Sequence, residues 1–241
     1  MTQTLKMFRQ PLLLDALEAG DRTPASAGQL ARINALPQVL RPLGEGDVLV
    51  RGMYLMNTLP MHNYLQFEAD VPVAARDMVI GKPVMRNHDT YSSDALPVGR
   101  IFDAKVVARG AGDPWLAVEF FMLNNERGRE FADAIDGGLV AENSPTVLYE
   151  RLTCSICGKD DLRCEHAPGK DYDGKLCTML MGGLVDVVEA SFAWAGMQRD
   201  TGFYLAAGKS VQAVDTLTML EQRGQHDLDS WESRFARWWK S

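Results

Sequence analysis

All four cysteines of the chain lie in one segment, Cys154 to Cys177, and this cluster constrains the local fold more than any other stretch. Cys154 and Cys157 form a CxxC knuckle followed by a glycine, and Cys164, His166 and Cys177 come after it. A CxxC turn brings two thiolates to one ion, and a second half with Cys or His completes a tetrahedral zinc site. Five candidate ligands compete for four positions. Both a four-cysteine site and a three-cysteine, one-histidine site therefore remain open.

Composition limits the classes of protein that this chain can belong to. The 241 residues carry a formal net charge of −7, which argues against a protein that coats nucleic acid, because phosphate binding needs a basic face. The apolar run that begins at Leu12 is interrupted by Asp15, so it is too short for a signal peptide. No stretch approaches the roughly 20 apolar residues of a membrane helix. We therefore expect an intracellular protein, in which clustered cysteines bind metal rather than form disulfides.

The chain divides into three parts by its patterns. Residues 1–44 are expected to form an N-terminal helical arm, in which Ser26 caps a helix that Pro37 ends. Residues 45–200 form the main domain, which contains the cysteine-rich insertion at 153–178. Residues 201–241 show helical spacing and are predicted to be a helical C-terminal segment.

The main domain reads as strands with one clear helix. Asn125 is a plausible N-cap, and Gly137 ends a helix in which Phe131 and Ile135 share a face. β-branched and aromatic residues predict strands at 48–57, 64–71, 98–108, 115–123, 146–152 and 184–194. The sequence therefore predicts an α+β protein.

A second group of residues has catalytic chemistry but a weak signal in isolation. A serine nucleophile needs a histidine base within hydrogen-bond reach, usually steadied by a carboxylate. The chain has only four histidines; His166 is a candidate metal ligand and His226 lies in a terminal turn. His62 and His88 remain as candidate bases for Ser144.

These residues, taken in order, resemble a known family. The motif Asn87-His88-Asp89 follows an apolar segment, a hairpin and a helix come next, Ser144 opens a strand, and Val-Glu-Ala-Ser at 188–191 completes the pattern. This order is similar to that of the prohead maturation proteases of tailed bacteriophages, whose β-barrel serine-protease fold is related to the herpesvirus assemblins. Some members share a CSICG…C.H..G..Y.GK.C insertion, which this chain carries from Cys154 to Cys177. The resemblance covers roughly residues 48–197.

The resemblance implies a fold, a reaction and partners. The expected fold is a mainly antiparallel β-barrel with flanking helices, a zinc-knuckle-like insertion and a helical C-terminus. Ser144 would be the nucleophile, His88 the general base and Glu189 the third member of the triad. The substrates would be the scaffold and major capsid protein, inside a prohead in the host cytoplasm. Self-cleavage and homo-oligomers fit this pattern, whereas membrane and nucleic-acid partners are not expected.

One departure from the family pattern opens an alternative. Pro145 stands directly after Ser144, where the family usually has a small residue and then glycine. Proline has no backbone N–H, so an oxyanion donor at this position would be lost. The rival hypothesis is a catalytically inactive capsid-assembly protein on the same fold. A zinc-ribbon nucleic-acid-binding module is a third reading, which the acidic residues around the cysteines disfavour.

Overall fold

The computed structural model describes residues 25–204, except 93–94, 110–112, 161–162, 194 and 199. The helices in this part are α1 (Ala27–Asn34), α2 (Val71–Met78), α3 (Glu126–Asp136) and the short 3-10 helix η1 (Glu45–Asp47). The strands are β1 (Val48–Met56), β2 (Leu65–Phe67), β3 (Pro83–Arg86), β4 (Gly99–Arg109), β5 (Asp113–Leu123), β6 (Glu142–Cys154), β7 (Asp171–Tyr172), β8 (Lys175–Leu176), β9 (Met179–Ala193) and β10 (Gly202–Tyr204).

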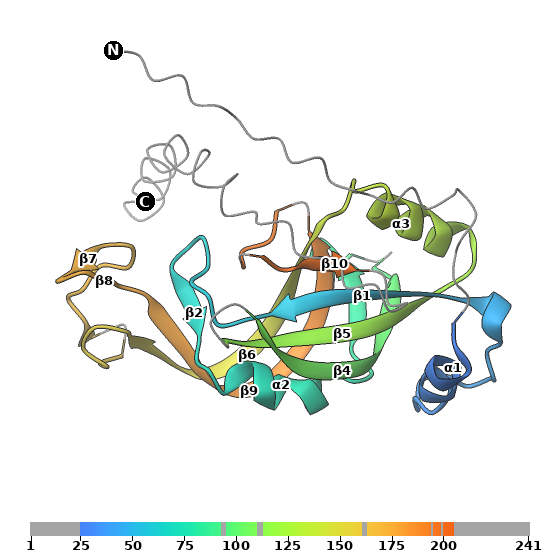
Figure 1. The fold of residues 1–241 in the computed structure, drawn as a ribbon, viewed down its shortest axis with the longest axis horizontal. Helices are drawn as coiled ribbons and strands as arrows, with labels where there is room; N and C mark the ends of the chain where they lie inside the picture. Colours follow the sequence, from blue (N-terminus) through green and yellow to red (C-terminus); the bar gives the residue numbers. More distant parts are fainter. Residues whose placement is uncertain are drawn as a thin grey trace, which may run out of the picture.

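Eight of these strands form one curled mixed sheet (Figure 1). The order is β10-β1-β5-β4-β3-β9-β2, and β6 pairs with β9 outside this path. The β2–β9 and β3–β9 pairs are parallel, while the other pairs of this sheet are antiparallel. The predicted α+β class is confirmed, and the sheet has the form of a half-barrel. Strand β9 is its central element, because it pairs with β2, β3 and β6.

The main hydrophobic core packs on one face of this sheet and explains the apolar run of β5. Phe120, Leu116 and Met122 face the main core, where Phe120 also packs edge-on against Phe192 of β9. Phe121 points to the other face, into a smaller cluster beneath α1. A strand covered on both faces has no solvent side, so its sequence shows little polar alternation.

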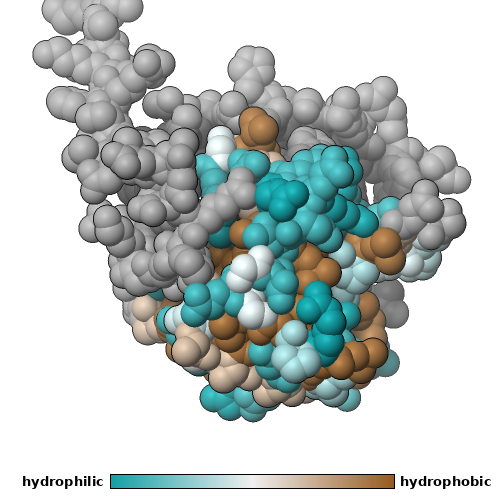
Figure 2. Space-filling view, turned by 90° about the vertical axis from the view of Figure 1, so that its right-hand side faces the viewer, coloured by the Kyte–Doolittle hydropathy of each residue, from teal (hydrophilic) through white to brown (hydrophobic). Residues whose placement is uncertain are grey.

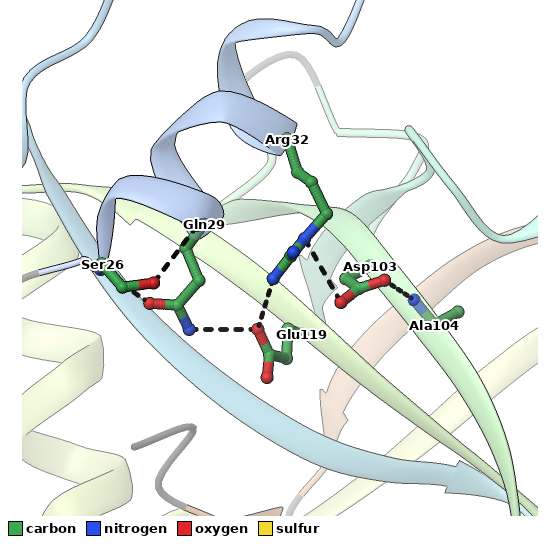
Figure 3. A network of polar contacts seen from close by, with 6 residues as sticks. All are labelled: Ser26, Gln29, Arg32, Asp103, Ala104 and Glu119. Atoms are coloured by element: carbon green, nitrogen blue, oxygen red, sulfur yellow. Dashed lines mark hydrogen bonds and ion pairs between the residues drawn. The ribbon is translucent and has the colours of Figure 1, made fainter. Parts of the chain in front are cut away.

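Helix α1 confirms the predicted helix after Ser26 and is fixed to β4 and β5 by polar contacts (Figure 3). Ser26 and Gln29 form a capping box, with a distance of 3.2 Å from Gln29 N to Ser26 Oγ. The Gln29 amide also donates to Glu119 of β5 at 3.1 Å, and Arg32 forms an ion pair with Asp103 of β4 at 3.3 Å. The described part of the N-terminal arm therefore packs on the sheet.

Two sequence predictions need correction. The strand predicted at 64–71 is confined to Leu65–Phe67, because α2 begins at Val71 with Pro72 in its first turn. Val71, Ala75 and Val79 lie four residues apart and are buried, a helical spacing present in the sequence. The C-terminal segment predicted to be helical from residue 201 instead opens with strand β10, which pairs with β1. The rest of that segment, and the first part of the arm, lie outside the described residues.

The surface that carries α1 and α3 is mixed in character. Hydrophobic side chains reach this face in separate patches between hydrophilic ones (Figure 2). Among the described residues, no helix is long and apolar enough to cross a membrane.

An ion pair between the buried Arg51 and the partly exposed Asp136 ties β1 to the end of α3. Arg51 is almost fully buried, and its Nε donates to Asp136 Oδ1 at 2.8 Å while its Nη2 donates to Oδ2. Removing one partner of such a pair leaves a buried charge without compensation. We expect Asp136→Ala to lower the free energy of unfolding by about 3 kcal/mol, the lower end of the range for buried pairs, in urea denaturation. Asp77→Ala, which breaks the fully exposed Arg76–Asp77 pair, is the control and should leave the midpoint unchanged.

Candidate active site and metal centre

His88 lies in a tight turn at the end of β3 whose backbone is unusual. Asn87 and His88 both have positive φ angles, 51° and 55°. Such left-handed backbone costs a non-glycine residue on the order of 1 kcal/mol or more, so neighbouring contacts must hold it. Asn87 N donates to Phe192 O at 3.0 Å and His88 N donates to Ser191 Oγ at 2.9 Å. Strand β9 thus fixes the turn by accepting hydrogen bonds from the backbone N–H groups of Asn87 and His88.

Glu189 projects from β9 toward this turn and is only 1% exposed. Its Oε1 lies 2.7 Å from His88 Nδ1, and its Oε2 accepts a hydrogen bond from Ser191 Oγ at 2.6 Å. Thr146 Oγ1 donates a further, short hydrogen bond to Oε1. A buried carboxylate is tolerated when its oxygens are paired in this way.

A bulge in β9 lies directly beside Glu189. Thr146 of β6 faces Glu189, but Val147 faces Val187, so Val188 is an extra residue on β9. Because side chains alternate along a strand, one inserted residue reverses the face on which all following side chains lie. The bulge therefore lies at the edge of the regular segment in which Glu189 and Ser191 share the face toward His88.

The electrostatics of the pair match its geometry. The hydrogen bond to Glu189 raises the pKa of His88 above its ordinary value, against the opposing effect of burial, and the carboxylate charge adds to the rise. Burial acts to raise the pKa of Glu189, but the hydrogen bonds from His88, Ser191 and Thr146 outweigh it and lower that pKa. Glu189 is therefore ionised at neutral pH and favours a proton on His88 Nδ1.

Ser144 lies on the same strand as Thr146, two residues before it. It faces Ser191 across the β6–β9 pair, so Ser144 and Thr146 point to the same side of the sheet as Ser191 and Glu189. Within the described part of the chain, no hydrogen bond joins Ser144 Oγ to His88. The hydroxyl that touches the ring is that of Thr146, whose Oγ1 lies 3.1 Å from His88 Nδ1. The structure thus brings His88 and Glu189 together and places Ser144 on the same side of the β6–β9 pair, with no hydrogen bond from Ser144 to His88 among the described residues.

Four of the five predicted ligands form a compact cluster. The ligand atoms of Cys154, Cys157, Cys164 and His166 all lie within 4.8 Å of one another. Cys164 Sγ is 3.5 Å from Cys157 Sγ and 3.5 Å from His166 Nδ1. Ligands of a tetrahedral zinc ion with Zn–S bonds of about 2.3 Å lie about 3.8 Å apart, so three sulfurs and one nitrogen at this spacing suit such an ion. The cluster could bind a metal ion.

The fifth predicted ligand, Cys177, approaches the cluster from the other end of the insertion. It is fully buried, and its Sγ lies 3.8 Å from Cys154 Sγ. It is not one of the four clustered ligands, but its distance to Cys154 also matches a tetrahedral edge.

The thiols of Cys154, Cys164 and Cys177 have shifted pKa values. Burial and the neighbouring sulfurs raise the pKa of both Cys164 and Cys177 to about 11. Burial also opposes ionisation of Cys154, but hydrogen bonds from the backbone of Cys157 and Ile156 and from nearby thiols outweigh it and lower the pKa of Cys154 to about 6. The raised pKa values of Cys164 and Cys177 reflect the cost of placing further negative charge beside buried, neighbouring sulfurs.

The candidate triad and the cysteine cluster lie toward opposite ends of the same pair of strands. Ser144 faces Ser191 at one end of β6–β9, and Cys154 faces Met179 at the other. The cysteine-rich insertion, with the β7–β8 hairpin, lies at the far left of the fold (Figure 1). Any metal in the insertion is therefore remote from His88.

Sequence reasoning missed two residues of the candidate active site, Thr146 and Ser191. Ser191 was visible only as part of the Val-Glu-Ala-Ser motif, two residues after Glu189 and thus on the same face of a strand. For Thr146 the signal was the same spacing after Ser144, but its contact with Glu189 depends on the register of β6 against β9.

No family model, curated protein or solved structure matches the chain.

Proposed function

We propose that the chain is a serine endopeptidase of the prohead-maturation type, with Ser144, His88 and Glu189 as its triad. The observation that carries the proposal is the contact of 2.7 Å between His88 Nδ1 and the buried carboxylate of Glu189. A carboxylate on Nδ1 holds the imidazole in the tautomer whose Nε2 can accept a proton. Glu189 is a buried carboxylate paired with a half-exposed histidine. Such a pairing is more typical of a catalytic site than of a purely structural ion pair.

The proposed reaction is hydrolysis of a peptide bond through an acyl-enzyme. Ser144 Oγ attacks the carbonyl carbon while His88 Nε2 takes the hydroxyl proton, and Glu189 stabilises the imidazolium. The C–N bond then breaks, and the departing amine takes that proton from His88. A water molecule, deprotonated by His88, then attacks the acyl carbon, the bond from that carbon to Ser144 Oγ breaks, and His88 returns the proton to Ser144 Oγ. Because Pro145 has no N–H, the oxyanion must be stabilised by donors other than the residue after the nucleophile.

The proposal includes the biology that the sequence pattern implies. The substrates are the scaffold and the major capsid protein, with self-cleavage as a further reaction, inside a prohead in the host cytoplasm. Cleaving these proteins inside the closed shell removes contacts that hold the immature lattice, and this makes capsid maturation irreversible. The mainly antiparallel β-barrel core and the helical C-terminal segment belong to the same proposal.

The metal of the insertion is proposed to be Zn²⁺ with a structural role. Cys154, Cys157 and Cys164 would hold it together with His166, or with Cys177 in its place. Zinc bound there would supply cross-links to a segment whose apolar cluster, among its described residues, has three buried members, Cys154, Cys177 and Met179.

Activity should rise with pH. A raised pKa keeps His88 protonated, and therefore unable to act as a base, to a higher pH than a free histidine with pKa of about 6.5. We expect the rate of Ser144 acylation to increase through a midpoint above that value. Glu189→Gln removes the carboxylate that raises the pKa, so its midpoint should move down and its rate should fall. A wild-type rate that is constant from pH 5 to pH 9 would contradict the role of His88.

Labelling with a fluorophosphonate probe tests the proposed function. The wild-type protein is expected to form one covalent adduct, which peptide mass spectrometry places on Ser144. His88→Ala should abolish the adduct, because the hydroxyl loses its base. An adduct on another serine, or labelling of Ser144 that persists without His88, would refute the proposed triad.

A second candidate function, an inactive capsid-assembly protein, is favoured by Pro145 and by the missing hydrogen bond between Ser144 and His88 among the described residues. It predicts a folded protein that no fluorophosphonate labels. It also predicts that Ser144→Ala supports head assembly as well as the wild type does.

A further inference from the structure

Thr146 is the hydroxyl residue that touches both members of the His88–Glu189 pair. Its Oγ1 donates a short hydrogen bond to Glu189 Oε1 and lies 3.1 Å from His88 Nδ1. The β6–β9 register places Thr146 directly opposite Glu189, so the contact follows from strand pairing rather than from a mobile loop.

We propose that Thr146 is a positioning residue of the active site, which clamps the Glu189 carboxylate and fixes the proton of His88 on Nδ1. This inference rests on the proposed function. It assigns Thr146 no bond to the substrate: Ser144 is the nucleophile, and Thr146 acts through the other two residues.

The positions of the hydroxyl proton of Thr146 and the ring proton of His88 support this role. An ionised carboxylate only accepts hydrogen bonds, so the single hydroxyl proton of Thr146 must point to Glu189. Toward His88 the same oxygen can then only accept, which requires a proton on Nδ1. A neutral imidazole with its proton on Nδ1 has a free lone pair on Nε2, the atom that must receive the proton of Ser144.

Rigidity supports the role as well. Glu189 has three side-chain partners, with Ser191 on Oε2 and both His88 and Thr146 on Oε1. Threonine is branched at Cβ, so its χ1 angle is restricted and its hydroxyl stays on the carboxylate. Without Thr146, Oε1 would depend on His88 alone, the partner that must carry and release charge during the reaction.

The charged surroundings of Glu189 are simple. His88, from the turn after β3, is the charged residue against it among the described side chains, while Thr146 of β6 and Ser191 of β9 are neutral. The nearby carboxylate of Asp89 is engaged by Ser92 at 2.6 Å. A change in the titration of Glu189 on altering Thr146 therefore reports the loss of the hydroxyl.

The test is a ¹³C NMR titration of the Glu189 side-chain carboxyl in the full chain, assigned with Glu189→Gln. Thr146→Val keeps the shape of the side chain and removes the donor, so the midpoint of Glu189 should rise. Thr146→Ser restores the donor and should return the midpoint toward the wild-type value. Thr153→Val, the same substitution farther along β6, is the matched control and should change nothing. Fluorophosphonate labelling of Ser144 should fall about 10- to 100-fold in Thr146→Val, the effect of losing one hydrogen bond to a charged group.

Two outcomes would overturn the inference. One is a Glu189 midpoint that is the same in Thr146→Val and the wild type. The other is a Thr146→Ser variant that behaves like Thr146→Val, since packing rather than the hydroxyl would then matter. If Thr146→Val does not fold, Thr146→Ala carries the same expectation. The titration is independent of activity: a wild type that is never labelled refutes the proposed function, while a shifted midpoint would still support the clamp.

Discussion

Ser144→Ala is expected to stop the processing of the scaffold protein when the two are expressed together, with a fall in rate of at least about 10⁴-fold. Removing the nucleophile of a serine protease leaves only the contribution of substrate binding and oxyanion donors, and the loss can reach on the order of 10⁶-fold. The measurement is the appearance of shortened scaffold on a denaturing gel over time. The same loss is expected with the capsid protein as substrate.

The control and a second variant make this result specific. Ser26→Ala removes a helix cap at α1 whose hydrogen-bond partner is Gln29, not a residue of the candidate triad, and should process scaffold at the wild-type rate. His88→Ala should be about as slow as Ser144→Ala, and the double variant no slower, because residues that act as one unit are not additive. Normal processing by Ser144→Ala would eliminate the proposed function and leave the assembly protein.

Local patterns in the sequence were enough to predict most elements of the fold. The glycine stop and N-cap around α3 and the apolar run of β5 are short-range signals, and both elements lie where they were expected. Helix α2 was missed because the aromatic and β-branched residues before it suggested a longer strand. The curl of the sheet and the parallel pairing of β9 with β2 and β3 were also not visible, since they depend on contacts between distant segments.

The same distinction holds for the candidate active site. His88 and Glu189 could be chosen by residue type and motif, and the structure brings them into contact. The left-handed turn at Asn87 and His88 is formed by non-glycine residues, so no glycine marked it in the sequence. The bulge at Val188 is likewise hidden, because an extra residue in a strand is defined only against its partner. Thr146 could not be found without that register.

The five candidate ligands show what spacing can and cannot decide. CxxC spacing identified the cluster, and four of its members converge within 4.8 Å. Spacing could not separate His166 from Cys177, because both follow the knuckle after loops long enough to fold back. Which of these two residues joins the cluster depends on the path of the insertion between Cys164 and the β7–β8 hairpin.

Removal of the metal is expected to unfold the insertion and to release about one equivalent of zinc. Zinc contributes about 10–16 kcal/mol of apparent binding free energy in small zinc-finger peptides, far more than the small apolar cluster of this segment can replace. Cys157→Ser, or treatment with a strong chelator, should therefore expose the insertion to proteases. Elemental analysis and mass spectrometry of the first tryptic cuts measure both effects.

Single substitutions then identify the fourth ligand. Because His166 is a member of the four-residue cluster, His166→Ala should lose the metal and Cys177→Ser should retain it. The reverse result would assign a four-cysteine site. His62→Ala, which lies outside the insertion, is the control and should keep a full equivalent of metal. A wild-type protein that binds no zinc would refute the structural metal altogether.

Because the insertion lies far along β6 from Ser144, its unfolding on metal loss should leave the candidate active site intact. Ten residue steps along β6 separate Ser144 from Cys154, about 33 Å for an extended strand, and paired β9 residues accompany the strand along this length. His88 is held by Thr146, Glu189 and Ser191, and the preceding Asn87 by Phe192; all four contacts lie at the end of the β6–β9 pair opposite Cys154. Chelation should therefore lower the unfolding temperature while the folded protein still labels Ser144 at 10 °C. Loss of labelling in step with the loss of zinc, with the remaining fold intact, would show instead that the metal holds the register on which the candidate active site depends.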